Sequence, residues 1–344
     1  MKKGIRLLFL LFFAFSALSP GLFAEDPPED TLTKGKIRKK GNIAVFNRKL
    51  IDALNSGDLK ASKRWAKRAD PNALTPDTKT PVIILAMQKG MREAAEIIAS
   101  KKKFDPNVRS SDANQYTPLY LSINYNYPEV FMAVVDAGAN LEDKCFGYTP
   151  LNFAAKMRNV TMVQYLQKKG ADINAKNSQN YSNTALVYAI FNNDAKMVRT
   201  LLNLGADKNT VDTYGWTPLM FASWYGYLEI MDLLLKGGSG SVVSLETRTF
   251  KDGDTALLLA LKNGRTAAAQ KLRWAGANIT VVNNLNESAL FHAARTNDHF
   301  FILELIGAGM DVKQKNKCGR TPLTSAAWSG HYGTMWLLRQ HGAK

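Results

Sequence analysis

Cysteine and histidine are scarce in this sequence, and their placement argues against metal or redox chemistry. There are two cysteines, Cys145 and Cys318, and four histidines. No Cys-x-x-Cys group occurs, and no pair of histidines stands at metal-ligand spacing with a carboxylate. We therefore expect no metal site and no other cofactor.

Glycine-rich and nucleophile motifs of enzymes are also missing. The stretch 237–240 is not followed by Lys-Ser or Lys-Thr, so it fails the phosphate-loop pattern. No Gly-x-Ser-x-Gly elbow is present for a serine nucleophile. We therefore predict a protein that is not an enzyme.

The apolar run near the N-terminus is too short to span a bilayer comfortably. It covers residues 7–18, whereas a spanning helix needs about 20 residues. Basic residues precede it and a Pro-Gly pair and Ala24 follow it, which is the pattern of a signal peptide over residues 1–24. Cleavage is expected after Ala24. Because Leu22 occupies a position that favours a small residue, an uncleaved membrane anchor is the alternative.

What the sequence does contain is a repeat. A threonine, once a serine, followed by proline or alanine returns at spacings between 32 and 38 residues. A period near 33 indicates stacked units, and no single unit could bury its apolar face without its neighbours. These eight markers begin at Thr80, Thr117, Thr149, Thr184, Thr217, Thr255, Ser288 and Thr321.

Each unit is predicted to hold two helices. The marker threonine caps the first helix, and proline fits the first turn, where a missing N–H has no effect. Further along, the second helix ends in a Gly-Ala phrase such as Gly170-Ala171, where glycine provides a left-handed cap. One unit therefore consists of a helix, a turn, a second helix and a loop.

The marker and the Gly-Ala phrase together resemble the ankyrin repeat. The similarity is clearest at residues 212–219, Asp-Thr-Tyr-Gly-Trp-Thr-Pro-Leu, and at residues 170–174, Gly-Ala-Asp-Ile-Asn. It covers residues 42–344 and implies an all-α solenoid of stacked helix-turn-helix units with short hairpin-like loops. The family usually has a histidine two residues after the proline, which bonds between neighbouring repeats. Here that position holds Ile83, Tyr120, Asn152, Val187, Met220, Leu258, Phe291 and Thr324.

The predicted organisation has three parts. A signal peptide at 1–24 precedes a basic leader at 25–41 and a solenoid at 42–344. The first unit lacks the marker and is interpreted as an N-terminal cap. An insertion at 237–241 enlarges one loop, either as a hinge or as a surface insertion. The units are 42–74, 75–111, 112–143, 144–178, 179–211, 212–249, 250–282, 283–315 and 316–344.

Four Asn-x-Ser/Thr sequons lie inside the repeats, and two of them stand where a glycan would crowd a neighbouring element. This favours a bacterial envelope over a eukaryotic secretory route. We predict an exported protein that is periplasmic or secreted. The sequons begin at Asn159, Asn180, Asn278 and Asn286.

Aromatic residues occupy the positions with which ankyrin-like stacks usually bind, at loop tips and on the exposed edge of the first helices. Large rings dominate binding hot spots, and an exposed patch of them marks a partner site. The resemblance therefore implies a non-enzymatic scaffold that holds a protein partner in a concave aromatic groove. Two alternatives are rings that stack only to stiffen the loops, and rings that bind the faces of a sugar. The ten residues are Tyr116, Tyr125, Phe146, Tyr148, Tyr181, Phe191, Tyr214, Trp216, Trp224 and Tyr225, with Trp328 as a more distant eleventh.

Positive charge is concentrated towards the N-terminus of a chain whose formal net charge is +16. Five basic residues there have a helical spacing that places them along one face. Such a stripe fits an anionic surface of lipid, polysaccharide or nucleic acid, which is the alternative function. The other interpretation is a solvated face of the cap. The five residues are Lys60, Lys63, Arg64, Lys67 and Arg68.

Both cysteines are expected as exposed thiols at loop tips. With layers about 10 Å apart, five units separate Cys145 from Cys318 by roughly 50 Å, so they cannot pair within one chain. Either thiol could link two chains, or both could be incidental. The oligomeric state stays open.

Overall fold

The computed structural model describes residues 38–178, 181–236 and 242–344, with side chains from residue 42 onward. It confirms the predicted all-α class, because these residues hold eighteen helices and no strand. Their loops pair only through isolated bridges, such as the one between Cys145 and Tyr148. The predicted signal peptide, most of the basic leader and the insertion at 237–241 lie outside the described residues.

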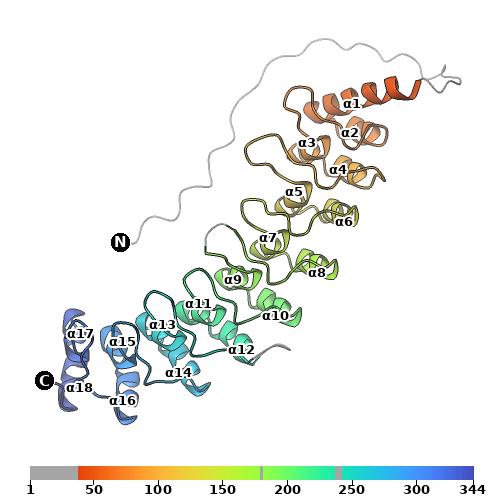
Figure 1. The fold of residues 1–344 in the computed structure, drawn as a ribbon. Helices are drawn as coiled ribbons and strands as arrows, with labels where there is room; N and C mark the ends of the chain where they lie inside the picture. Colours follow the sequence, from red (N-terminus) through yellow and green to blue (C-terminus); the bar gives the residue numbers. More distant parts are fainter. Residues whose placement is uncertain (1–37, 179–180, 237–241) are drawn as a thin grey trace. The chain divides into compact units, whose positions relative to one another are not determined.

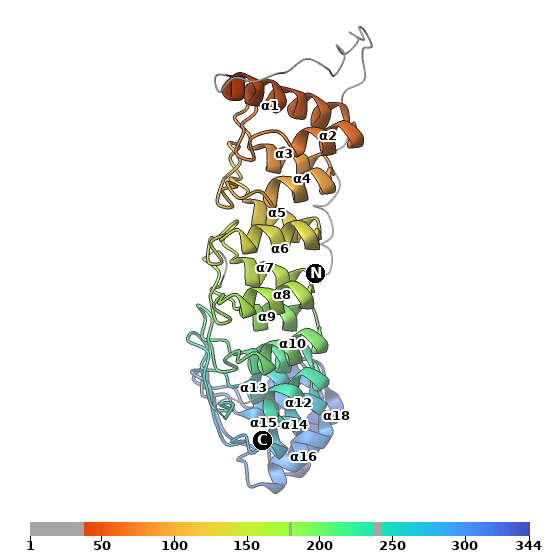
Figure 2. The ribbon, with the colours of Figure 1, turned by 90° about the vertical axis from the view of Figure 1, so that its right-hand side faces the viewer.

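Residues 41–344 form one compact unit in which helices are paired in chain order (Figure 1). From α3 to α17, the first helix of each pair packs on the first helix of the next, which makes one layer. The second helices make the other layer, and the loops between pairs lie beside the first helices (Figure 2). The pairs are α1 (Arg38–Ser56) with α2 (Leu59–Ala66), α3 (Val82–Gln88) with α4 (Arg92–Ala99), α5 (Pro118–Asn124) with α6 (Pro128–Asp136), α7 (Pro150–Lys156) with α8 (Val160–Lys168), α9 (Ala185–Phe191) with α10 (Ala195–Asn203), α11 (Pro218–Tyr225) with α12 (Leu228–Lys236), α13 (Ala256–Lys262) with α14 (Thr266–Trp274), α15 (Ala289–Thr296) with α16 (His299–Gly307), and α17 (Pro322–Trp328) with α18 (Tyr332–Gln340).

The marker threonines cap most of the first helices as predicted. At α5, the Thr117 hydroxyl accepts a hydrogen bond from the backbone N–H of Tyr120 at 3.1 Å, and proline occupies the first turn. The same cap is found at α7, α11, α13 and α17. The prediction is wrong at three markers. Helix α3 begins after Pro81, one residue too late for Thr80, and the Thr184 and Ser288 hydroxyls are buried without a described hydrogen-bond partner.

The predicted left-handed glycines are confirmed at the ends of second helices. Gly170 follows α8 with a φ of +96°, a region that a residue with a Cβ rarely adopts. This conformation turns the chain out of the helix and into the loop that leads to the next unit.

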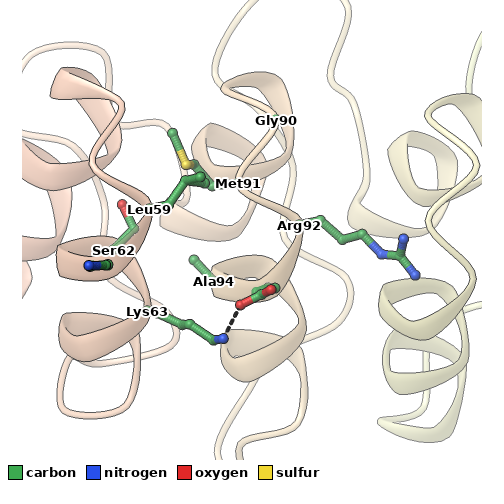
Figure 3. A pocket seen from close by; sticks show the side chains of 9 residues that line it. Leu59, Ser62, Lys63, Gly90, Met91, Arg92 and Ala94 are labelled. Carbon is green, nitrogen blue, oxygen red and sulfur yellow. Dashed lines mark ion pairs between the residues drawn. The ribbon is translucent and has the colours of Figure 1, made fainter.

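Ion pairs join successive second helices. Figure 3 shows the first of them, in which Lys63 of α2 pairs with Glu93 of α4. Further along, Lys271 of α14 lies 2.6 Å from the Asp232 carboxylate of α12. Partly exposed pairs contribute about 0–1 kcal/mol each, so packing rather than charge holds this layer together.

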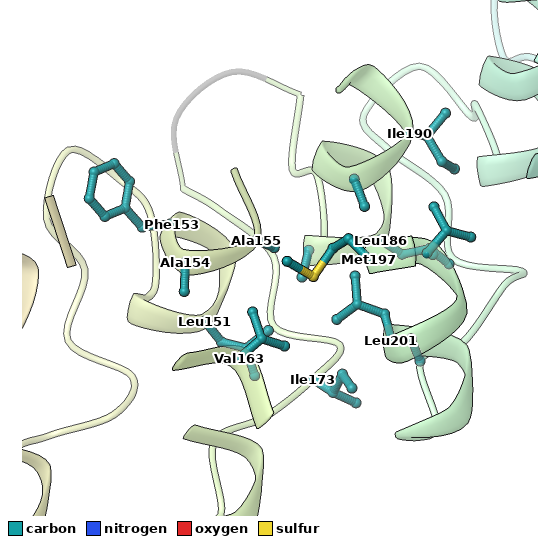
Figure 4. Close-up of a cluster of buried hydrophobic side chains, with 14 of the residues drawn as sticks. Leu151, Phe153, Ala154, Ala155, Val163, Ile173, Leu186, Ile190, Met197 and Leu201 are labelled. Carbon is teal, nitrogen blue, oxygen red and sulfur yellow. The ribbon is translucent and has the colours of Figure 1, made fainter. Parts of the chain in front are cut away.

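The apolar core lies between the two layers and continues from one pair to the next. In Figure 4, the small Ala155 of α7 lies beside the longer side chain of Met197 in the next pair, and both are buried. Alanine lets the helices approach closely, and the longer side chains fill the remaining space. Burial of one leucine contributes roughly 1.5–3 kcal/mol. Contact between neighbouring units is therefore the main source of stability in this stack.

A row of side-chain hydrogen bonds links the loops of neighbouring units. The Asn174 side-chain oxygen accepts a bond at 2.8 Å from the backbone N–H of Asp207, in the next unit. The Asp172 carboxylate accepts from the Asn174 N–H at 2.9 Å, which fixes the loop that presents the asparagine. Equivalent bonds join Asn72 to Asp105, Asn107 to Asn140, Glu142 to Asp172, Asn209 to Ser244 and Glu246 to Asn278.

Candidate functional site

Most of the predicted partner residues lie in one continuous series of touching rings on the first helices and their adjoining loops. We call this series the aromatic band. Its rings come from successive pairs between α5 and α12, so the band crosses three borders between units. Its members are Tyr116, Tyr120, Phe146, Tyr148, Phe153, Tyr188, Phe191, Trp216, Phe221 and Trp224.

The first half of the band joins α5 to α9. Tyr116, in the loop before α5, stacks on Tyr120 with ring centroids 5.8 Å apart. Tyr120 stacks on Phe153 of α7 at 4.3 Å, and Phe153 lies 6.0 Å from Tyr148. Tyr148 then contacts Tyr188 of α9 at 5.3 Å. Favourable ring pairs have centroids about 4.5–7 Å apart, so all of these pairs are in contact and Tyr120 and Phe153 are the closest.

The second half of the band ends in two tryptophans. Tyr188 and Phe191 of α9 meet edge to face at 6.2 Å, and Phe191 contacts Phe221 of α11 at 5.0 Å. Phe221 lies 5.0 Å from Trp216, which meets Trp224 edge to face at 5.3 Å. The band therefore places its two largest rings side by side on one unit.

Two sets of rings flank the band at the loop tips and helix ends. Tyr181 and Tyr214 pair across neighbouring loop tips at 5.3 Å. At the far end of α11, Tyr225 stacks on Tyr227 at 5.3 Å and also contacts Phe191. Tyr125 occupies the matching place after α5, close to Tyr127. The tip pair has the geometry of the stiffening alternative, because each ring contacts the neighbouring tip.

Burial separates the ten predicted residues into two groups. Six are exposed, and Tyr214 and Tyr181 are the most open, with 51% and 52% of their surface accessible. Four are half-buried and pack against the apolar core, namely Tyr116, Tyr148, Trp216 and Trp224. The expectation that these rings lie on an exposed edge is therefore wrong for these four, which contribute to the packing of the core. Each of these four rings packs partly against the core and leaves the rest of its surface accessible to solvent.

Four residues that join the band were not predicted. Tyr120, Phe153, Tyr188 and Phe221 all lie three or four residues after a marker threonine, on the first helix itself. Two of them stand one helical turn before a predicted ring, as Tyr188 does before Phe191, which places both on one helix face. The helical period was the signal that could have found them.

Cations and amides border the band. The Lys156 ammonium lies 4.3 Å from the centroid of the Tyr148 ring and donates to its hydroxyl at 2.9 Å. The Tyr188 hydroxyl accepts from the Asn177 side-chain amide at 2.5 Å. Burial raises the pKa of Tyr188 far above its ordinary value, so this ring stays neutral. The band is therefore apolar along its length and carries hydrogen-bonding groups at its edge.

A small hollow of about 140 Å³ lies beside the two tryptophans. Its lining includes Trp216 and Trp224, together with Lys262 of α13 and the acidic side chains Asp252 and Asp254. Lys262 contacts the buried Asp254 carboxylate at 3.0 Å, and Asp254 also accepts from the Asn283 amide at 2.9 Å. The hollow therefore combines aromatic and charged side chains.

The two cysteines differ, which corrects the expectation of two exposed thiols. Cys318 is exposed, but Cys145 is buried, because its loop folds back on the unit through the bridge to Tyr148. Burial raises the pKa of the Cys145 thiol to about 11. Of the two, only Cys318 is placed to react.

The basic stripe divides into two groups. Arg64 and Arg68 flank the indole of Trp65 at 5.0 and 5.8 Å, and Lys49 of α1 lies 4.6 Å from the same ring centroid. Phe46 stacks on Trp65 at 5.8 Å, so three cations surround a stacked aromatic pair. Each such contact contributes about 0.5–1 kcal/mol at an exposed site.

The remaining stripe residues lie elsewhere on α2. Lys60 and Lys63 face the hollow between α2 and α4, and Lys67 is the exposed C-cap. Within the described ranges, no three histidine, cysteine, aspartate or glutamate side chains gather closely enough to hold a metal ion. None of the helices there combines the length and apolar character that crossing a bilayer requires.

The helix pairs and the loops between them agree with a known family model. The model for ankyrin repeats in three copies matches overlapping segments at 103–177, 125–212, 177–246, 207–283 and 257–344. The chain belongs to the ankyrin-repeat family. Ankyrin repeats are modules for protein–protein interaction and are typically not enzymes, so this repeat protein is an interaction scaffold.

Several relatives share the repeats within longer proteins. Human transient receptor potential cation channel subfamily A member 1 is 24% identical over 366 residues, which cover 94% of this chain and 31% of the human protein. Ankyrin repeat protein nuc-2 of Neurospora crassa is 25% identical over 303 residues, covering 84% of this chain and 27% of that protein. The mouse B-cell lymphoma 3 protein homolog is 29% identical over 202 residues, covering 57% and 44%. The chain spans less than half the length of each.

Proposed function

We propose that this ankyrin-repeat protein holds a protein partner against the aromatic band, without catalysing a reaction. The observation that carries the proposal is the continuity of the band across unit borders, combined with exposed rings at its edge. Rings already held by their neighbours lose little conformational entropy when a partner covers them.

The expected anchors are the exposed rings, and the tryptophans form the floor beneath them. Tyr214 and Tyr225 present apolar faces with hydroxyl groups at the rim, as hot-spot residues do. The hollow between Trp224 and Lys262 would take one side chain of the partner. A flat sugar face is a second occupant that such rings accept, and the capture experiment below separates the two.

The test is an affinity capture from the envelope fraction and culture fluid of the parent cell, followed by mass spectrometry. The wild-type chain is compared with a Tyr214→Ala/Tyr225→Ala double variant. The matched control is Tyr332→Ala/Trp336→Ala, which removes two exposed rings far along the chain in α18. A protein lost only from the first variant supports the proposal. Equal capture by all three chains, with unchanged circular dichroism, rejects it.

A second candidate function is the binding of an anionic surface by the cations around Trp65. The observation that favours it is the cluster of Lys49, Arg64 and Arg68 on one ring. Binding of anionic vesicles that falls steeply with added salt, and that Arg64→Gln/Arg68→Gln abolishes, supports this mode. Vesicle binding that survives the double substitution rejects it.

We also propose that the chain is exported to the periplasm or beyond, on the strength of the signal-peptide pattern at residues 1–24. Mass spectrometry of the mature N-terminus tests this directly. A first residue at Glu25 supports export with cleavage after Ala24. A mature protein that retains Leu22 supports the uncleaved anchor instead.

A further inference from the structure

A hollow of about 350 Å³ lies between α2 and α4, away from the aromatic band (Figure 3). Leu59, Lys60, Ser62 and Lys63 of α2 line one side of it. Residues 90–94, which include the first turn of α4, line the other. The hollow is therefore built from two neighbouring units and exists only where they are stacked.

The first turn of α4 presents backbone donors to this hollow. The helix begins at Arg92, and its first regular bond runs from the Ala95 N–H to the Met91 carbonyl at 3.0 Å. The N–H groups of Glu93 and Ala94 precede that bond and have no intrahelical acceptor. The N-cap residue is Met91, which provides no side-chain cap. A helix N-terminus in this condition attracts an anion.

A buried hydroxyl in the same wall is a second, independent indication of a ligand. Ser62 lines the hollow and is only 1% exposed, and its Oγ has no hydrogen-bond partner among the described residues. Leaving a buried hydroxyl unsatisfied costs about 1–3 kcal/mol. A ligand oxygen that accepts from Ser62 would remove that cost.

The charges around the hollow favour a dianion over a neutral ligand. Lys60 is exposed and makes no ion pair in the described part of the chain, while Lys63 pairs with Glu93 across the opening. Arg92 extends away and pairs with Glu129 of the next unit. An incoming anion must therefore compete with the Glu93 carboxylate for Lys63, and a doubly charged group competes better than a singly charged one.

The remaining lining is apolar. Leu59 is 66% exposed at the rim, and Met91 and Ala94 form part of the wall. An anion with no apolar portion would leave this surface in contact with water. A ligand with a small ring or short alkyl group beside its charge would cover it.

We propose that this hollow is a binding site for a small phosphomonoester. The phosphate accepts hydrogen bonds from the Glu93 and Ala94 N–H groups and from the Ser62 hydroxyl, and it contacts the ammonium groups of Lys60 and Lys63. The apolar part of the ligand lies on Leu59 and Met91. This site is independent of the partner proposed for the aromatic band.

The test titrates the full chain with phenyl phosphate and with inorganic phosphate, using calorimetry and the amide NMR shifts of Glu93 and Ala94. Lys60→Gln/Lys63→Gln is expected to weaken phenyl phosphate by roughly tenfold or more, and Ser62→Ala by about threefold to tenfold. Glu93→Gln is expected to tighten binding, because it removes the competing carboxylate. Lys67→Gln is the control, since it removes one charge from the C-terminal end of the same helix, outside the hollow.

Tighter binding of phenyl phosphate than of inorganic phosphate, with movement of both amide signals, supports the site. Absence of binding by either probe overturns it. An equal loss with Lys67→Gln overturns it as well, because the attraction would then be diffuse. Binding only to vesicles that contain phosphatidate would show that these lysines bind a membrane surface and not a small phosphomonoester. That result would overturn the small-ligand site. Circular dichroism of each variant confirms that the chain is folded.

Discussion

The side-chain oxygen of Asn174 accepts a hydrogen bond from the backbone N–H of Asp207, 33 residues further along and in the next unit. This bond connects the loop that follows α8 to the loop that follows α10. Among the described residues, equivalent bonds are found at six of the eight borders between units. The loops are therefore held in register by short polar side chains.

Replacing Asn174 with alanine is expected to destabilise the stack by about 0.5–1.5 kcal/mol, because one hydrogen bond is lost and the Asp207 N–H can turn to water. Asn174→Asp keeps the acceptor oxygen and is expected to stay within about 0.5 kcal/mol of wild type. Urea unfolding measures both, and amide exchange at Asp207 localises the effect. Equal losses in the two variants would contradict the role of the bond.

The half-buried rings of the aromatic band and the exposed rings that flank it should differ in what they contribute, the first to stability and the second to binding. Trp216→Ala is expected to cost roughly 2 kcal/mol of unfolding free energy, less than the 3–5 kcal/mol of a fully buried ring, because Trp216 is half-buried against the core. Tyr214→Ala should change stability by less than about 0.5 kcal/mol and yet weaken partner capture. Thermal unfolding and capture yield, measured on the same samples, distinguish the two effects.

Two features disfavour a side chain at Gly215, namely its left-handed backbone conformation and the nearby ring of Phe250. The φ of Gly215 is +80°, and an added Cβ would lie 2.7 Å from the Phe250 ring. Gly215→Ala is therefore expected to cost more than Gly319→Ala, which has a similar φ of +75° but open space around it. The backbone term alone is about 1 kcal/mol. Adding Phe250→Ala to Gly215→Ala should restore part of the loss, which a double-mutant cycle by urea unfolding measures.

His292 should make stability depend on pH. It is buried, and burial together with nearby Arg295 and Lys262 lowers its pKa from 6.5 to about 3. The unfolded chain therefore binds a proton that the folded chain does not, between about pH 6.5 and pH 3. Stability should fall by up to about 1.4 kcal/mol per pH unit as the pH drops below 6.5. His292→Leu should flatten this slope between pH 6.5 and 5, as followed by thermal unfolding. An unchanged slope would contradict the buried neutral form.

The two thiols should react at very different rates. At pH 8, a soluble maleimide is expected to label Cys318 readily, whereas Cys145 is buried and has a pKa raised to about 11. Cys318→Ser should abolish most labelling of the native chain, and Cys145→Ser should leave it nearly unchanged. Intact-mass measurement before and after denaturation counts the labels. Two rapid labels on the native protein would contradict the burial of Cys145.

Sequence reasoning predicted the helix pairs well, because caps and glycines are local and repeat with the unit. It did not predict the partial burial of Trp216 and Trp224, since that burial depends on how these rings and Phe221 pack on one another and against the core. The same limit applies to Thr184, whose marker position predicts a cap that the side chain does not make.

The hollow at Ser62 illustrates a related limit. Its wall combines residues of two units that are about 30 positions apart in the sequence. No spacing rule connects a serine on α2 with the amides of α4. Only the packing of the two units shows that the hydroxyl is enclosed.

The polar links between loops have a consequence for how such a chain can change over generations. Each link requires one acceptor on a unit and one backbone N–H on the next, and a backbone N–H is supplied by almost any residue. Duplication or loss of a whole unit would therefore leave every remaining border intact. The stack can therefore gain or lose units by recombination while the packing within the remaining units stays unchanged.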